Sequence, residues 1–159
     1  MRHATVARLT SSIYGTVLAI ALVAAYSAEE DLEPLVIAAA LLATLAVFWL
    51  AHSQAELLAV RYAAGHALSR AEVREHIRHG FAMVEAGFPL VGALLLGAVG
   101  LVGDDTSIDL ALGVGVAELA AWGVAVGSRE KLGTLQTFGV TAVNVSLGLA
   151  VVVLKLVIH

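Results

Sequence analysis

The chain has 159 residues, of which 60% are apolar and 14% are charged, with no cysteine and a formal net charge of -4. A water-soluble domain carries charge on roughly a quarter of its residues, so this composition excludes a soluble globular protein. It also excludes a disordered chain, which needs more charge, and a disulfide scaffold, which needs cysteine. The chain is therefore expected to fold in a lipid bilayer.

Five apolar stretches are each long enough to cross a hydrocarbon core about 30 Å thick, which takes roughly 20 helical residues. A lone segment in lipid must satisfy its own backbone hydrogen bonds, and only a helix does so. The sequence thus predicts an all-α integral membrane bundle that forms one domain over residues 1–159. Cleavage of the first stretch as a signal peptide would leave four spans, but no small-x-small cleavage site follows it. The predicted spans cover residues 10–27, 34–60, 80–102, 107–127 and 134–157.

The charges between the spans predict the orientation. Five crossings place the N-terminal segment and the second and fourth interruptions on one side, and these segments carry the basic residues. By the positive-inside rule that side is the cytoplasm, so the N-terminus is cytoplasmic and the C-terminus is outside. We expect a multi-pass protein of a prokaryotic plasma membrane. Lys155 lies near the outer end of the last span, where its long side chain can snorkel to the interface. The basic residues on the cytoplasmic side are Arg2, Arg8, Arg61, Arg70, Arg74, Arg78, Arg129 and Lys131. The acidic residues of the outer loops are Glu29, Glu30, Asp31, Glu33, Asp104, Asp105 and Asp109.

Two local signals shape the second and third spans. Residues 61–79 predict a short cytoplasmic helical hairpin that turns near Gly65–Ser69. Ser69 is a suitable N-cap, and Glu72, three residues later, completes a capping-box pattern. Pro89 cannot donate a backbone hydrogen bond, so it predicts a kink four residues after Glu85.

Several polar side chains remain inside the apolar spans. A charged carboxylate near the bilayer centre costs roughly 2.5–3.5 kcal/mol on insertion scales, so such groups normally face a bundle interior or a wet cavity. His52 and Glu56 are four residues apart and therefore share one helix face. We expect one cavity, open to the cytoplasm, to gather the polar side chains. These are Tyr14, His52, Glu56, Glu85, Glu118 and Asn144.

Two groups of histidine and glutamate residues have side chains that can bind a cation. An imidazole with two carboxylates can bind a divalent transition metal or relay protons, and His52, Glu56 and Glu85 supply that set. A second set at helical spacing lies in the hairpin and consists of Glu72, His76 and His79. In the structural alternative, the hairpin charges form an ordinary solvated helix surface, and the intramembrane polar groups only hold helices together. A divalent transition metal is the one cofactor that these patterns suggest.

The predicted function follows from these groups. We expect a small transporter or channel for a cation, either a divalent metal or a proton. A structural or regulatory membrane protein and a membrane-embedded metalloenzyme are the alternatives. No nucleotide loop, nucleophile elbow or HExxH helix is present, which favours a non-enzymatic function, and no basic patch interleaved with aromatic residues predicts nucleic-acid binding. Gly123 and Gly127 at GxxxG spacing suggest a homodimer through small-residue helix faces.

The order of motifs resembles the vacuolar iron transporter family of divalent iron and manganese exporters. The matching features are five helices, the segment RLTSSIYGTVLAIALVAA in the first span, AGFPLVG in the third and KLGTLQTFGVTAVN leading into the fifth. The resemblance implies a five-helix membrane fold and divalent metal transport. The acidic Asp-Gly expected after Gly15 is replaced by Thr16 and Val17, and the family's large cytoplasmic metal-binding domain is reduced to residues 61–79.

Overall fold

The computed structural model describes residues 2–27, 29 and 32–158, with side chains described for 5–27, 29 and 32–153. Glu30 and Asp31 of the predicted acidic loop lie outside the described residues, as do the side chains of Arg2 and Lys155. The described part of the chain is helical and contains no strand. The all-α prediction is therefore confirmed.

Five segments are long and apolar enough to cross a membrane, as the sequence predicted. The first, second, fourth and fifth are single helices, whereas the third, Arg70–Ala98, is divided into three. The helices are α1 (Arg2–Tyr26), α2 (Pro34–Ala64), α3 (Arg70–Gly80), α4 (Ala82–Glu85), α5 (Phe88–Ala98), α6 (Asp104–Arg129) and α7 (Thr134–Ile158).

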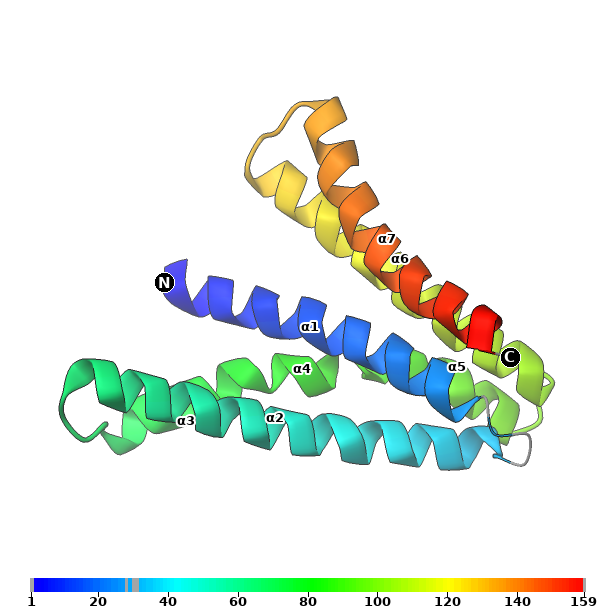
Figure 1. The fold of residues 1–159 in the computed structure, drawn as a ribbon, viewed down its shortest axis with the longest axis horizontal. Helices are drawn as coiled ribbons and strands as arrows, with labels where there is room; N and C mark the ends of the chain where they lie inside the picture. Colours follow the sequence, from blue (N-terminus) through cyan, green and yellow to red (C-terminus); the bar gives the residue numbers. More distant parts are fainter. Residues whose placement is uncertain (1, 28, 30–31, 159) are drawn as a thin grey trace.

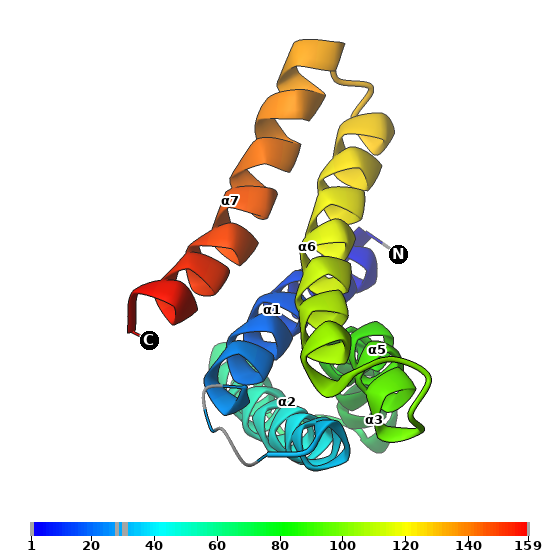
Figure 2. The same cartoon turned by 90° about the vertical axis from the view of Figure 1, so that its right-hand side faces the viewer.

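The two ends of the bundle differ in charge. The start of α1 and the α2–α3 and α6–α7 turns lie toward one end, and the α1–α2 and α5–α6 connections lie toward the other (Figure 1). We call the first the basic end, for Arg8, Arg61, Arg78 and Arg129, and the second the acidic end, for Glu29, Glu33, Asp104 and Asp105. Toward the basic end the α6–α7 hairpin diverges from α1, as Figures 1 and 2 both show.

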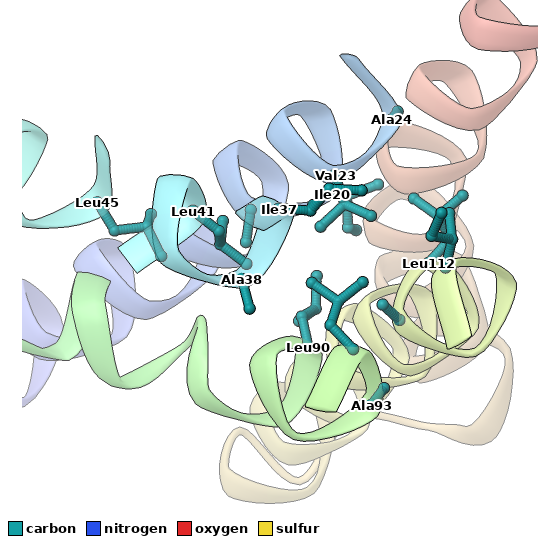
Figure 3. Close-up of a cluster of buried hydrophobic side chains, with 14 of the residues drawn as sticks. Ile20, Val23, Ala24, Ile37, Ala38, Leu41, Leu45, Leu90, Ala93 and Leu112 are labelled. Carbon is teal, nitrogen blue, oxygen red and sulfur yellow. The ribbon is translucent and has the colours of Figure 1, made fainter. Parts of the chain in front are cut away.

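The hydrophobic core occupies the half of the bundle nearer the acidic end. Large apolar side chains from α1, α2, α5 and α6 meet there, and several are fully buried (Figure 3). Apolar side chains gain little by leaving lipid, so close shape fit holds these helices together. The central members are Ile20, Val23, Ile37, Leu41, Leu90, Leu94 and Leu112.

Glycines allow the closest helix contacts. A Cβ at Gly15 would collide with the backbone of Met83, so α1 and α4 approach more closely than other residues allow. At Gly123 a Cβ would lie 2.6 Å from the Thr141 Cα, and at Gly127 it would meet Thr137. The predicted GxxxG face is therefore covered by α7 of the same chain. A second chain would have to share this face with α7, so the homodimer stays a prediction.

The hairpin between the second and third spans forms as predicted. Gly65 ends α2 with a φ of 66°, a left-handed conformation that glycine adopts without steric cost. Ser69 caps α3, because its hydroxyl accepts a hydrogen bond from the Glu72 backbone N–H while the Glu72 carboxylate accepts one from the Ser69 N–H at 2.8 Å. Both halves of the capping box are present.

The third span is interrupted where the sequence predicted a kink. Helix α4 ends at Glu85, and α5 begins at Phe88 with Pro89 as its second residue. Pro89 has no N–H to donate to the carbonyl four residues earlier, which belongs to Glu85. The Glu85 side chain thus lies directly at the break in the span.

Candidate functional site

A cavity of about 640 Å³ opens between α1, the third span and α6 in the half of the bundle nearer the basic end. Its volume is within the range of small-molecule sites. The wall combines charged groups with apolar and aromatic side chains, and consists of Thr5, Arg8, Leu9, Arg78, His79, Phe81, Glu85, Trp122, Ala125, Val126 and Arg129.

Glu85 is ion-paired within this cavity. Nη2 of Arg8 donates a hydrogen bond to Oε2 of Glu85 at 2.8 Å, and the two side chains are 62% and 43% exposed. The pair connects the basic end of α1 to the break in the third span. Its exposure means that water screens the attraction, so the pair positions the helices more than it stabilises them.

Glu118 lies deeper in the bundle, one helical turn from the cavity wall. It precedes Trp122 by four residues on α6, so the two side chains share a face about 6 Å apart along the axis. The Thr16 hydroxyl and the Trp122 indole face its carboxyl. Yet Oε2 of Glu118 and Nε1 of Trp122 are buried without a hydrogen-bond partner among the described residues. The hydroxyl of Thr16 donates instead to the Ser12 carbonyl at 3.0 Å.

Tyr14, His52 and Glu56 form a separate cluster between α1 and α2. The Tyr14 and His52 rings are stacked with centroids 6.5 Å apart, and Nε2 of His52 lies 3.6 Å from Oε1 of Glu56. Tyr14 and Arg8 are six residues apart on α1, which at about 100° per residue places them on different faces. A smaller cavity of about 260 Å³ is lined by Tyr14 and His52, and it contains none of the residues around Glu85.

The hairpin residues divide between two roles. Glu56, Glu75, His76 and His79 line a third cavity of about 390 Å³ beside α1. Glu72 does not line it, because its carboxylate accepts hydrogen bonds from the hydroxyl and the backbone N–H of Ser69. These two bonds lower the pKa of Glu72, with smaller contributions from nearby histidines. Glu72 is therefore a capping residue of α3.

The predicted six-residue cavity does not form. Glu85, Glu56 and the pair of Tyr14 with His52 line three different cavities, and Glu118 lines none of these three. The reason is geometric, because Tyr14 and Arg8 turn different faces of α1 toward their partners. Among the described residues, no three His, Asp or Glu side chains come close enough together to hold a metal ion.

Asn144 is also apart from these groups. It is half-buried on α7, on the face that carries Thr141 and Gly148, and both of these contact α6. It lines none of the described cavities. Asn144 therefore belongs to the α6–α7 packing face by its position on the helix.

Sequence reasoning assigned no site role to five residues in or near the cavity of about 640 Å³. Arg8, Arg78 and Arg129 served only to predict the orientation, Thr16 was noted only as a replacement, and Trp122 was given no role. One signal was available for Trp122, since it follows Glu118 by four residues on the same predicted helix face. No comparable spacing connects Arg8 to Arg129, because they lie on different spans.

The comparisons with known proteins found no match to a family model, a curated protein or a solved structure.

Proposed function

We propose that this chain is a small membrane transporter that moves protons, with Glu118 as the group that binds and releases them. The single observation that carries the proposal is the half-buried side chain of Glu118, whose Oε2 is buried and has no hydrogen-bond partner among the described residues. An ionisable group deep in a membrane bundle is costly, and proteins use such groups for proton and ion movement.

The position of Glu118 relative to the cavity supports the same function. Trp122 is part of the cavity wall and Glu118 precedes it by four residues, so the cavity comes within about one helical turn of Glu118 from the basic end. Toward the acidic end, Ile20, Leu112 and Leu119 are buried in the core. A carboxyl with an open cavity on one side and a packed core on the other suits alternating access. The break at Glu85 gives the third span a point at which it can bend.

A divalent metal is less well supported as the cargo. The resemblance to vacuolar iron transporters favours one, and His52, Glu56 and Glu85 were the expected ligands. In the arrangement described, however, Glu85 pairs with Arg8 and lies in a different cavity from the other two. Metal transport would therefore require these helices to rearrange.

The orientation is part of the proposal. We place the basic end in the cytoplasm of a prokaryotic plasma membrane, by the positive-inside rule. The chain lacks cysteine, so single-cysteine variants can test this directly. A membrane-impermeant maleimide added to intact cells should label Thr106→Cys at the acidic end and leave Ala67→Cys unlabelled until lysis. Labelling in the opposite order would reverse the orientation.

The transport proposal is tested with purified protein in liposomes. A potassium gradient with valinomycin imposes an inside-negative potential, and a pH-sensitive dye follows proton uptake. Wild type should acidify the lumen faster than protein-free vesicles do, and Glu118→Gln should abolish the difference. Glu56→Gln is the matched control, because it removes another intramembrane carboxylate outside the largest cavity.

Both variants must first be shown to be monodisperse and to unfold near the wild-type temperature. A wild-type rate equal to that of empty vesicles would overturn the proposal. An equal loss of proton uptake in both variants would show that Glu118 is not the specific proton-binding group. Addition of Mn²⁺ or Fe²⁺ in a parallel assay, read with a metal-sensitive dye, tests the divalent alternative directly.

A further inference from the structure

The cavity of about 640 Å³ brings together positive charges from three spans. Arg8 is on α1, Arg78 on α3 and Arg129 in the last turn of α6, and all three line the same wall. The same wall carries one acidic side chain, Glu85, and that carboxylate is already paired with Arg8. Within the described part of the chain, neither Arg78 nor Arg129 has a carboxylate at ion-pair distance.

The arginines of this cavity differ in position from the other arginines at the basic end. Arg61, Arg70 and Arg74 also lie at the basic end, but they line none of the described cavities. Like charges repel one another in a cleft with low-dielectric walls, so a cluster in which three arginines face a single carboxylate attracts an anion. Guanidinium groups bind phosphate oxygens with paired, charge-assisted hydrogen bonds. The chemistry of the wall therefore matches a phosphate group.

Apart from Thr5 and His79, the rest of the wall is apolar or aromatic. Leu9, Phe81, Trp122 and Val126 lie with the arginines around the same space. Basic pockets between transmembrane helices on the cytoplasmic side are known to suit anionic lipid headgroups. A phosphate group that is attached to an apolar body would satisfy both parts of the wall, and a free phosphate compound would satisfy the basic part alone.

We propose that this cavity binds the phosphate group of an anionic ligand, held by the guanidinium groups of Arg8, Arg78 and Arg129. The site is independent of proton movement, because none of these arginines binds the proton in that proposal. Glu85 opposes the ligand, since it occupies Arg8 and is itself negative. Removing its charge should therefore tighten binding, whereas removing an arginine should weaken it.

The test uses the purified full chain in a neutral detergent and isothermal titration calorimetry. One arm titrates dihexanoyl phosphatidylglycerol below its critical micelle concentration, and the other titrates inorganic phosphate. The double variant Arg78→Ala with Arg129→Ala should lose affinity by at least about tenfold. The matched double variant Arg70→Ala with Arg74→Ala removes the same charge outside the cavity and should stay within about twofold of wild type.

The opposite-sign variant makes the test sharper. Glu85→Gln should tighten binding by about threefold, because Arg8 is released and the repulsive charge is gone. Binding of the lipid alone assigns the phosphate to a headgroup, and binding of inorganic phosphate alone assigns it to a soluble compound. No saturable binding in either arm, or equal losses in the two double variants, would overturn the site. Calorimetry reads ligand binding and the liposome assay of Glu118→Gln reads proton movement, so failure here is distinct from failure of proton movement.

Discussion

The two halves of α1 lie in different surroundings. Toward the acidic end, Ile20 and Val23 are fully buried against α2, α5 and α6. Toward the basic end, the Arg8 side chain is 62% exposed and lines an open cavity. Helix α1 thus passes from a tightly packed half of the bundle, which we call the closed half, into a half with an open cavity, which we call the open half. The change coincides with the divergence of the α6–α7 hairpin from α1 (Figure 1).

This difference explains where the polar groups lie. In lipid, helices associate through shape fit, so a region where the helices separate loses packing but gains space for water and charge. The separated half holds Arg8, Glu85 and Trp122 in one cavity, and Glu118 lies one helical turn from Trp122 on α6. Tight packing in the closed half holds the helices together at the acidic end, so the cavity opens only toward the basic end.

The largest predicted effect lies at the boundary between the halves. Gly15→Val places side-chain atoms against the Met83 backbone, which cannot move aside as a side chain could. We expect a loss of about 3 kcal/mol or more in the free energy of unfolding, at the upper end for overpacking. Unfolding by sodium dodecyl sulfate in mixed micelles measures it.

Gly92→Val is the matched control for this change. Nothing lies within 4 Å of a Cβ at Gly92, so the same substitution should cost less than about 1 kcal/mol. If both variants were equally stable, α1 and α4 would not be in close contact, and the boundary would have to be drawn elsewhere.

The next effect tests the closed half itself. Leu94 is fully buried and Leu95, its neighbour on α5, is 40% exposed. Leu94→Ala should cost about 2–3 kcal/mol, near the low end for buried leucine, because lipid replaces part of the hydrophobic term. Leu95→Ala should cost less than about 1 kcal/mol, because lipid already contacts the side chain. Equal costs, measured by the same unfolding assay, would mean that protein packing does not distinguish the two positions.

A smaller effect tests the open half. Glu85→Gln breaks the ion pair with Arg8, but both side chains are largely exposed. We expect the free energy of unfolding to change by no more than about 1 kcal/mol. A loss as large as that of Leu94→Ala would show that the open half is held by this pair, contrary to the comparison drawn above.

The sequence predicted what depends on local pattern. Five helical segments long and apolar enough to span a membrane, the turn at Gly65, the capping box at Ser69 and the break near Pro89 each follow from neighbouring residues, and each is present. The expected six-residue cavity depended on how the helices rotate about their axes. The expectation rested on the polarity of side chains inside apolar spans, which contains no information on which face each helix turns toward the next.

The convergence of Arg8, Arg78 and Arg129 was unpredictable for the same reason. The arginines lie on three spans, and only the packing of α1 against the third span and α6 brings them together. Close contacts set by Gly15 and Gly115 determine that packing, and glycine composition alone does not say which helix fills the space. The GxxxG pair at Gly123 and Gly127 illustrates this, because its partner is α7 within the chain.

The smallest predicted effect concerns the end of the open half, where the Ser69 capping box starts α3. Hydrogen bonds from the Ser69 hydroxyl and backbone N–H lower the pKa of Glu72 below its ordinary value of 4.5. Because the folded pKa is the lower one, the stabilisation is present above about pH 4.5 and is lost as the pH falls through the folded pKa. The carboxyl carbon of Glu72, followed by NMR in detergent with labelled glutamate, should titrate below 4.5 in wild type. In Ser69→Ala the midpoint should move back toward that value, because the hydroxyl donor is gone. An unchanged midpoint would show that the hydroxyl does not stabilise the carboxylate, and the start of α3 would then depend on backbone contacts alone.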